Sequence, residues 1–425
     1  MSANSAASAA ATGVTANGNS ASGPASDGVA THNSAATHNS AATRRGVATR
    51  LVHTAHKDEF GAIAEPIYLS SSYRLPADGS EAPYAYQRSN NPTRESAERA
   101  VASLEGAAYA IGTATGMGAI STVFSQLKPG DHVVLTSAVY GGTFLYVQEF
   151  FAARGITANF ESDLNNLEAL PENTTLVFIE TPTNPTFRVT DIAHAAKLAH
   201  AVGAQLVVDN TFSTALWQRP LELGADVVVY SATKFLGGHS DVLAGFIVLN
   251  DAAAYEKYKR ATKALGNVLS PFDSYSILRG LKTLAVRLDK QQENAAVLRE
   301  LLSSHPAVSR VLVPGWYSKQ EAEIQAAQAA GAGSVFGFEL APGLRHKDFA
   351  RGLELIAYAV SLGSVETLIA HPATQIHEDL TPAEREAAGI SDQLIRVSVG
   401  IEDIADLQAD LRNALDTALA ARKQA

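Results

Sequence analysis

Lys234 is the residue whose surroundings point most directly to chemistry. It lies in the run YSATKFLGGH (residues 230–239), after an apolar stretch that is typical of a buried strand. A lysine at a strand end can form a Schiff base with an aldehyde, and the nearby hydroxyls of Ser231 and Thr233 can donate hydrogen bonds to a phosphate. Because pyridoxal 5'-phosphate combines an aldehyde with a phosphate, this run predicts a covalent anchor for that cofactor.

Four other predicted strands end in residues that suit the same cofactor. Ligands of open parallel sheets bind beyond the carboxyl ends of the strands. Asp209 follows the run LVV and can pair with a pyridinium nitrogen, and Asn184, in the turn ETPTNP, can reach the phenolic oxygen. Tyr140 precedes two glycines and can stack on a flat ring. Gly116 and Met117 open a predicted helix, whose first amides can bind a phosphate.

Each of these residues also has an ordinary structural explanation. A strand-end aspartate can cap a helix, a tyrosine can pack in a core, and a glycine-rich stretch can form a tight turn. The agreement of five strand ends on the needs of one phosphorylated pyridine is what favours the cofactor.

The elements that must position these residues follow an α/β pattern. Residues 46–265 alternate short apolar runs with amphipathic stretches, which predicts a mostly parallel sheet in a large domain, preceded by an N-terminal arm. Residues 266–425 predict a smaller α+β C-terminal domain. The predicted strands are 109–111, 132–135, 175–179, 206–208, 227–230, 246–249, 335–340, 358–361 and 395–399, and the predicted helices are 96–104, 144–153, 192–202, 271–293, 294–304 and 404–421.

Composition excludes several other classes of function. Residues 1–45 are poor in large apolar side chains and contain the repeat THNSAA, which predicts a disordered tail. The net charge of -10 argues against a nucleic-acid surface, and no apolar run is long enough to predict a membrane span. The chain has no cysteine, so disulfides and thiolate metal sites are excluded. We expect a cytoplasmic protein without a metal site.

From about residue 48 to its C-terminus, the chain resembles the Cys/Met-metabolism family of pyridoxal-phosphate enzymes, the transsulfuration group. The resemblance rests on the ordered motifs YQRSNNPT (86–93), TGM (115–117), YGGT (140–143), ETPTNP (180–185), VDNT (208–211), SATKFLGGH (231–239), SLG (361–363) and LIRVSVG (394–400). It implies an aspartate-aminotransferase-like fold, the type I fold of these enzymes.

The resemblance also implies roles for single residues. It gives the cofactor the contacts Lys234, Asp209, Tyr140, Gly116, Met117, Ser231 and Thr233. Ser361 and Arg396 would bind the substrate α-carboxylate, which suits the fork of a guanidinium. Tyr86 and Arg88 would reach the phosphate site of a neighbouring subunit. We therefore expect a homo-oligomer, a tetramer built from dimers that share their active sites.

The expected chemistry is the loss of a γ-substituent from an amino acid. Lys234, once free of the cofactor, is the natural proton shuttle, and Tyr140 can act on the leaving group as acid or base. Burial and the cationic cofactor are expected to lower the pKa of Lys234.

Three positions bear on which substituent leaves. Val360 replaces a glutamate of many cystathionine-handling relatives, and Leu145 replaces an arginine of several, so a neutral distal group is favoured. Methionine γ-lyases usually have cysteine where this chain has Gly142, and the run GHSD (238–241) resembles cystathionine γ-synthases and γ-lyases. We expect γ-replacement on an O-acylhomoserine, of the cystathionine γ-synthase or O-acetylhomoserine sulfhydrylase kind. The alternative is γ-elimination, as by a cystathionine or methionine γ-lyase.

Two more distant classes of function remain open. An aminotransferase would share Asp209 and Lys234 but not the motifs at residues 86–88 and 180–185. A non-catalytic binding protein would be expected to lose Lys234, Tyr140 or Arg396, all of which this chain retains.

Overall fold

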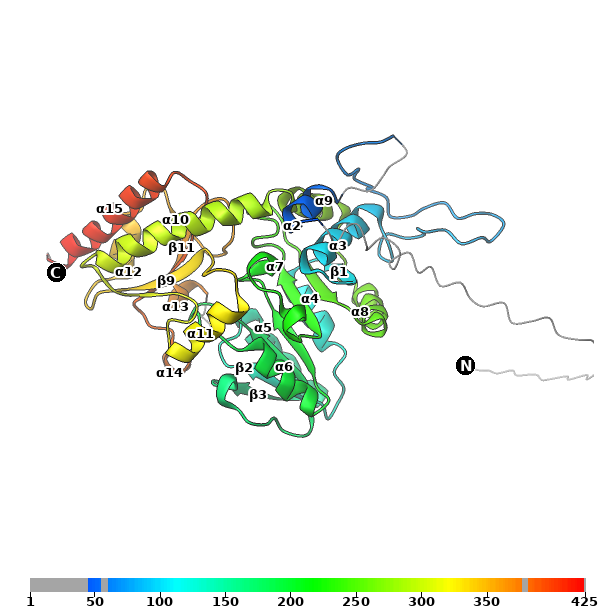
Figure 1. Ribbon diagram of the computed structural model, residues 1–425, viewed down its shortest axis with the longest axis horizontal. Coiled ribbons are helices and arrows are strands. Elements are labelled where there is room, and N and C mark those ends of the chain that lie inside the picture. The colour runs from blue at the N-terminus through cyan, green and yellow to red at the C-terminus, as the bar shows by residue number, and fades with distance from the viewer. Residues whose placement is uncertain (1–44, 55–59, 377–380, 424–425) are drawn as a thin grey trace, which may run out of the picture.

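Two sheets organise the chain in this computed structural model, which describes residues 45–54, 60–376 and 381–423 (Figure 1). Apart from its last residue, the predicted tail at residues 1–45 lies outside the described residues. The strands of the first sheet are β1 (Tyr109–Thr113), β2 (His132–Thr136), β3 (Thr157–Glu161), β4 (Thr174–Glu180), β5 (Gln205–Asp209), β6 (Val227–Ser231) and β7 (Gly245–Leu249). Those of the second are β8 (Val308–Leu312), β9 (Val335–Leu340), β10 (Ala357–Tyr358), β11 (Leu368–Ala370) and β12 (Leu394–Ser398).

Helices fill the segments between the strands. They are α2 (Val47–Val52), α3 (Pro92–Glu105), α4 (Gly116–Phe124), α5 (Gly141–Phe150), α6 (Ile192–Ala201), α7 (Thr214–Trp217), α8 (Ala252–Leu265), α9 (Pro271–Leu281), α10 (Leu284–Ser304), α11 (Lys319–Gln328), α12 (His346–Arg351), α13 (Pro372–Gln375), α14 (Pro382–Ala387) and α15 (Ile404–Arg422). In the described part of the chain, none of them is long and apolar enough to cross a membrane.

The first sheet confirms the predicted α/β class. Its order is β1-β7-β6-β5-β4-β2-β3, and the strands from β6 to β3 pair in parallel, whereas β7 runs antiparallel to both of its neighbours. Alternate residues of β4 face opposite sides: Leu176 and Phe178 join the cluster of α4 and α5, and Val177 and Ile179 join that of α6. Burial on both faces explains why these strands read as continuous apolar runs.

The strand order brings the predicted site together. β4, β5 and β6 are parallel neighbours, so their carboxyl ends share one edge of the sheet. Glu180, the last residue of β4, pairs in register with Asp209, the last residue of β5. Lys234 follows β6 by three residues. The edge therefore gathers side chains from three separate segments.

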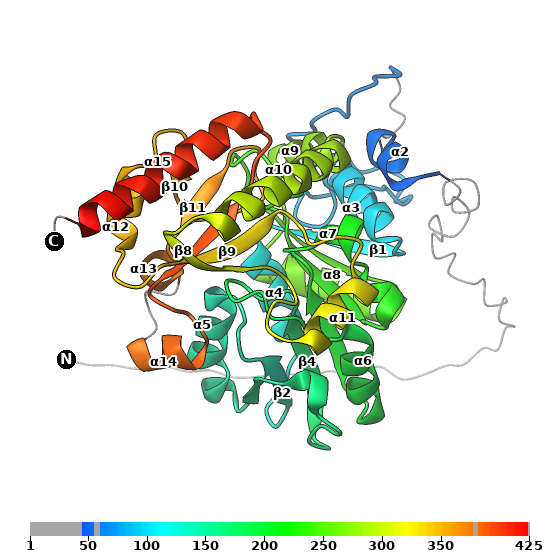
Figure 2. The ribbon, with the colours of Figure 1, turned by 60° about the vertical axis from the view of Figure 1, so that its left-hand side comes forward.

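The second sheet confirms a smaller α+β part. Its order is β10-β11-β12-β9-β8, and all pairs except β10 with β11 are antiparallel. α10 connects the two cores (Figures 1 and 2). Its first turns place Leu284 and Leu288 in the cluster of the first sheet, and its later turns place Leu298 and Leu302 in that of the second. The predicted domain boundary after residue 265 falls between α8 and α9.

Two predicted elements were placed wrongly. The helix boundary predicted at residues 293 and 294 lies inside α10, and the real break is at residues 282–283. There the end of α9 packs so closely on a loop that a Cβ on Gly280 would lie 2.3 Å from the Gly237 carbonyl oxygen. The predicted strand 358–361 shrinks to β10, because Ser361 has a φ of 83°, which no strand residue adopts.

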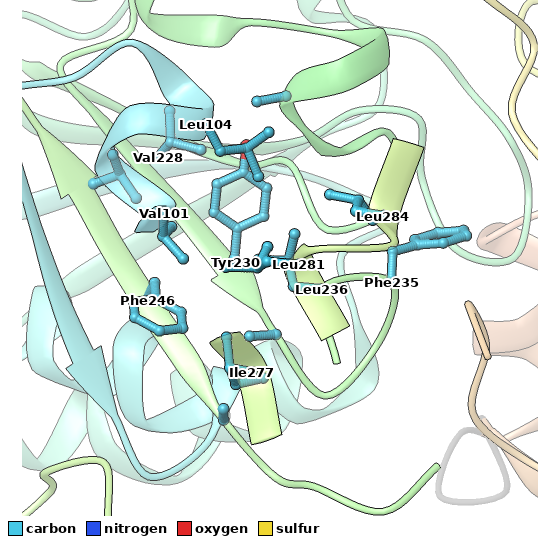
Figure 3. Close-up of a cluster of buried hydrophobic side chains, with 14 of the residues drawn as sticks. Val101, Leu104, Val228, Tyr230, Phe235, Leu236, Phe246, Ile277, Leu281 and Leu284 are labelled. Carbon is cyan, nitrogen blue, oxygen red and sulfur yellow. The ribbon is translucent and has the colours of Figure 1, made fainter. Parts of the chain in front are cut away.

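Glu105, the last residue of α3, is a buried acid that bonds Tyr230 of β6. Tyr230 sits among the apolar side chains of α3, β6 and β7 (Figure 3). Its hydroxyl donates to Glu105 Oε2 at 2.5 Å and accepts from Asn210 Nδ2 at 2.8 Å. Burial raises the pKa of Glu105 from 4.5 to about 8, so this carboxyl is largely protonated at neutral pH.

This raised pKa makes folding stability depend on pH. Because the folded state holds the proton more tightly than the unfolded state, the contribution of Glu105 is fully present below about pH 4.5 and is lost as pH rises through about 8. Glu105→Gln should remove that loss. Between pH 6 and pH 9, its free energy of unfolding should fall by about 1–3 kcal/mol less than that of wild type, measured by urea titration. Parallel pH profiles for the two proteins would contradict the assignment.

Candidate active site

Lys234 lies in the turn after β6, where its amine bonds Ser361, a residue 127 positions later in the chain. Its Nζ donates a hydrogen bond to Ser361 Oγ at 2.9 Å. Burial, with a smaller contribution from the Arg396 guanidinium, lowers the pKa of Lys234 to about 8. A substantial fraction of this amine is therefore neutral near physiological pH, and the neutral form is the one that attacks an aldehyde.

Ser361 joins Lys234 to Arg396, which lies on β12. Arg396 Nη2 donates to the Ser361 carbonyl oxygen at 2.5 Å, and Nη1 donates to Asn184 Oδ1 at 3.1 Å. Arg396 Nε is buried without a partner, and burial lowers the pKa of this guanidinium to about 10. A buried cation bonded to two neutral oxygens has an unmet demand for an anion, which a substrate carboxylate can satisfy.

Two buried carboxyl groups lie side by side at the ends of β4 and β5. Glu180 accepts the backbone N–H of Tyr140 at 2.7 Å and that of Asn184 at 2.9 Å, and Asp209 accepts the backbone N–H of Thr211 at 3.0 Å. Burial raises the pKa of both carboxyls, and the charge of Asp209 raises that of Glu180 further. A cationic N–H group placed beside them would stabilise their ionised forms.

Tyr140 is the exposed wall of the site. It caps the N-terminus of α5 with 43% of its surface exposed. A Cβ on Gly142 would lie 2.7 Å from Tyr140 Cε1 and 3.0 Å from Met117 Sδ, so the tyrosine ring and the methionine meet over this glycine. The Tyr140 phenol also acts on the pKa of Arg396, after burial, and therefore lies near the guanidinium. These observations place an aromatic ring beside Met117 and near Arg396.

The start of α4 provides a cradle for a phosphate. Its first-turn amides, including those of Gly116 and Met117, have no partners within the helix. A Cβ on Gly116 would lie 2.6 Å from Ser231 Cβ and 2.9 Å from its Oγ, so only glycine lets the start of the helix approach the serine this closely. Thr233 Oγ1 donates to the Ala244 carbonyl oxygen at 3.3 Å and accepts its N–H at 3.1 Å. A phosphate contact from Thr233 stays a prediction.

The contacts of Tyr86 and Arg88 within the described chain are with the arm and α8 rather than with the residues above. Both residues belong to the arm between α2 and α3, which extends from the body of the protein as loops coloured blue to cyan in Figure 1. Arg88 is exposed, lies over the Tyr86 ring and donates to the Lys263 carbonyl oxygen of α8 at 3.0 Å. Their predicted role in a neighbouring subunit's site therefore stays a prediction.

The remaining residues fit pyridoxal phosphate. An amine of lowered pKa is present for its aldehyde, a pair of buried carboxyls for its ring nitrogen, an aromatic wall for its ring and a glycine-shaped helix start for its phosphate. The fold and this site define a pyridoxal-phosphate enzyme of fold type I.

Comparison with known proteins identifies the family. A family model described as Cys/Met metabolism PLP-dependent enzyme matches residues 48–416. The chain is 42% identical over 371 residues to a cystathionine beta-lyase of Bacillus subtilis, a match that covers 86% of this chain and 95% of that protein. It is 43% identical over 362 residues to a cystathionine gamma-lyase of Dictyostelium discoideum, covering 84% and 93%.

The solved structures agree. A cystathionine gamma synthase from Xanthomonas oryzae pv. oryzae, in complex with aminoacrylate and cysteine, matches with a TM-score of 0.84 and 40% identity, covering 88% of this chain and 99% of that one. The chain belongs to the Cys/Met metabolism family of pyridoxal-phosphate enzymes. It is a transsulfuration enzyme of the carbon-sulfur lyase or transferase type.

Sequence reasoning missed Glu180. Only Asn184 was assigned a role in the turn ETPTNP, although the carboxylate of Glu180 holds the backbone of both Tyr140 and Asn184. The signal was the same one that identified Asp209, namely an acid at the end of an apolar strand. Such an acid costs free energy unless it has partners. Glu180 at the end of β4 is therefore predictable as a site residue on the same grounds as Asp209 at the end of β5.

Removing the charge of Arg396 should raise the pKa of Lys234. In the cofactor-free protein, Arg396→Gln is expected to move the pH midpoint for reductive methylation of Lys234 upward from about 8, because a neighbouring cation disfavours the ammonium form. Arg396→Lys keeps the charge and should leave the midpoint nearly in place. Mass spectrometry of the peptide that contains Lys234 gives both values, and equal midpoints in wild type and Arg396→Gln would refute the coupling.

Proposed function

We propose that the protein catalyses γ-replacement on an O-acylhomoserine, with pyridoxal phosphate anchored on Lys234. The observation that carries the proposal is the link from Lys234 Nζ through Ser361 to Arg396. An amino acid whose carboxylate binds Arg396 has its α-carbon within reach of the Lys234 amine. The same amine is then positioned to move protons at that carbon.

Each residue of the site has a task in this scheme. When bound, pyridoxal phosphate supplies an aldehyde for the substrate amine and a ring that withdraws electrons from its α-carbon. Lys234, with a pKa of about 8, takes and returns protons near neutral pH. Tyr140 donates a proton to the leaving group. Asp209 holds the ring-nitrogen side of the site, and Glu180 keeps Tyr140 and Asn184 in place.

The distal side favours an uncharged distal substituent, such as the acetyl group of O-acetylhomoserine. Leu145 and Val360 are apolar and exposed by 51% and 52%, so neither offers a charge to the second amino-acid end of cystathionine. The Tyr140 ring occupies the space that a side chain at residue 142 would need, so the cysteine of methionine γ-lyases would displace the ring. Elimination is the second candidate, because proteins named cystathionine gamma-lyase and beta-lyase are similar to this chain.

A substrate comparison separates these reactions. We expect the purified protein with pyridoxal phosphate to form product from O-acetyl- or O-succinylhomoserine, with cysteine or sulfide, at a higher kcat/KM than it degrades cystathionine or methionine. Lys234→Ala should abolish turnover and the absorbance of the anchored cofactor, whereas Lys128→Ala, at an exposed position, should change neither. Faster release of 2-oxobutanoate from the thioethers would establish γ-elimination instead, and release of pyruvate from cystathionine would establish β-elimination.

We further propose that the active site is shared across a dimer interface, within a homotetramer. Support comes from the arm, where Ile63, Leu69 and Leu75 are exposed by 92%, 73% and 64%. Apolar side chains on an extended arm indicate a surface that another subunit covers. Arg88 donates to the Lys263 carbonyl oxygen of α8 rather than to Gly116, Ser231 or Thr233 of its own chain, which fits the same arrangement.

Mixing of inactive subunits tests the shared site. When Arg88→Ala and Lys234→Ala chains are co-expressed, a mixed dimer contains one complete site, and activity should return to about a quarter of the wild-type level. Ser361→Ala mixed with Lys234→Ala is the matched control, because Ser361 and Lys234 bond within one chain and no complete site can form. Equal residual activity in the two mixtures would argue for a site built from one chain.

A further inference from the structure

One face of α10 carries a line of buried polar side chains. Arg287, Gln291 and Asn294 are spaced by four and three residues, so they lie above one another on the helix. They are exposed by only 3%, 0% and 1%. Burying a guanidinium and two amides costs free energy that an apolar face would not, so these residues require an explanation beyond packing. We call them the α10 stripe.

Arg287 holds the segment that carries Lys234. Its Nη1 donates to the Phe235 carbonyl oxygen at 2.9 Å, one residue after Lys234. Its other donors bond the α9–α10 junction, Nη2 to the Gly280 carbonyl oxygen at 2.9 Å and Nε to Thr283 Oγ1 at 3.1 Å. A Cβ on Gly238 would lie 2.1 Å from Nη1, so the guanidinium rests directly on the loop backbone.

The other two members hold the segments that carry Ser361 and Arg396. Gln291 Nε2 donates to the Ser364 carbonyl oxygen at 2.6 Å. Asn294 Nδ2 donates to the carbonyl oxygens of Gly400 and Glu402, at 3.3 Å and 2.9 Å, just beyond the end of β12. The partners of Gln291 and Asn294, and the Phe235 and Gly280 partners of Arg287, are main-chain carbonyls, so the stripe fixes the backbone of each segment.

The three segments also contact one another. The Val365 N–H donates to the Gly238 carbonyl oxygen at 3.0 Å, and the Gly363 N–H donates to Ser398 Oγ at 2.8 Å. A Cβ on Gly363 would lie 2.7 Å from the backbone nitrogen of Phe235. Backbones packed this closely transmit a shift in one segment to the next.

We propose that Arg287, Gln291 and Asn294 are positioning residues that set the spacing between Lys234 and the Ser361–Arg396 pair. The stripe thereby aligns the amine that handles the α-carbon with the groups that bind the carboxylate, across two sheets. These roles rest on the proposed function, whereas the fixing of the backbone does not. A misplacement of about 1 Å can reduce a rate by about a hundredfold, so the stripe bears directly on activity.

The test compares two buried glutamines. Gln325 on α11 is the matched control: like Gln291, it donates through Nε2 to a main-chain carbonyl, that of Gly331 at 3.2 Å, and its Oε1 has no partner. In the cofactor-free protein, Gln291→Leu should raise hydrogen exchange of the Gly363 and Val365 amides by about tenfold or more, and Gln325→Leu should not. With cofactor, Gln291→Leu should raise KM about tenfold with a smaller change in kcat.

The outcomes separate the two proposals. Equal exchange and equal KM in the two variants would overturn the positioning role. Arg287→Met should raise hydrogen exchange of the amides of residues 234–238, and Arg287→Lys, which keeps a cationic donor group, should restore part of their protection. If the exchange differences appear while none of the sulfur amino acids or esters is turned over, the stripe stands and the proposed function fails.

Discussion

Two cations share one serine at the centre of this protein. The Lys234 amine bonds the Ser361 side chain, and the Arg396 guanidinium bonds its carbonyl. Both are buried, and the pKa of each is lowered. Such a pair is unfavourable until an anion arrives, and in the proposed function the substrate brings a carboxylate to Arg396 alone. The arrangement would then favour a bound acid and a neutral amine, which suits the proton transfers proposed for Lys234.

Within the described residues, no carboxylate is among the groups that shift the pKa of Lys234 or Arg396, so the rest of the fold holds this pair in place by other contacts. The first sheet supplies the buried acids Glu180 and Asp209 at the ends of β4 and β5, and Lys234 in the turn after β6. The second sheet supplies Arg396, and the connection before β11 supplies Ser361 in a left-handed conformation. Positive and negative groups thus come from different strands. A ligand with a carboxylate for the positive groups and a cationic ring edge for the negative groups can pair with both.

Much of this could be read from the sequence because buried charges at strand ends are conspicuous. Lys234 and Asp209 stand out against apolar runs, and the α/β class follows from strands buried on both faces. The edge strands β3 and β8 lack such runs because their side chains are partly exposed. The α10 stripe was hidden for the opposite reason: polar residues at helical spacing normally indicate a solvent-facing surface. The positions of Tyr86 and Arg88 relative to a site depend on contacts between chains, which local pattern does not encode.

Gly142 has a consequence for how such a site can change. The residue is glycine because the Tyr140 ring fills the space above it. A substitution that adds a side chain there, to reshape the pocket for another leaving group, also moves the ring that Glu180 anchors through the backbone of Tyr140. If Tyr140 assists the leaving group as proposed, a side chain at residue 142 would change both the space for that group and the position of the acid, so the two positions are expected to vary together.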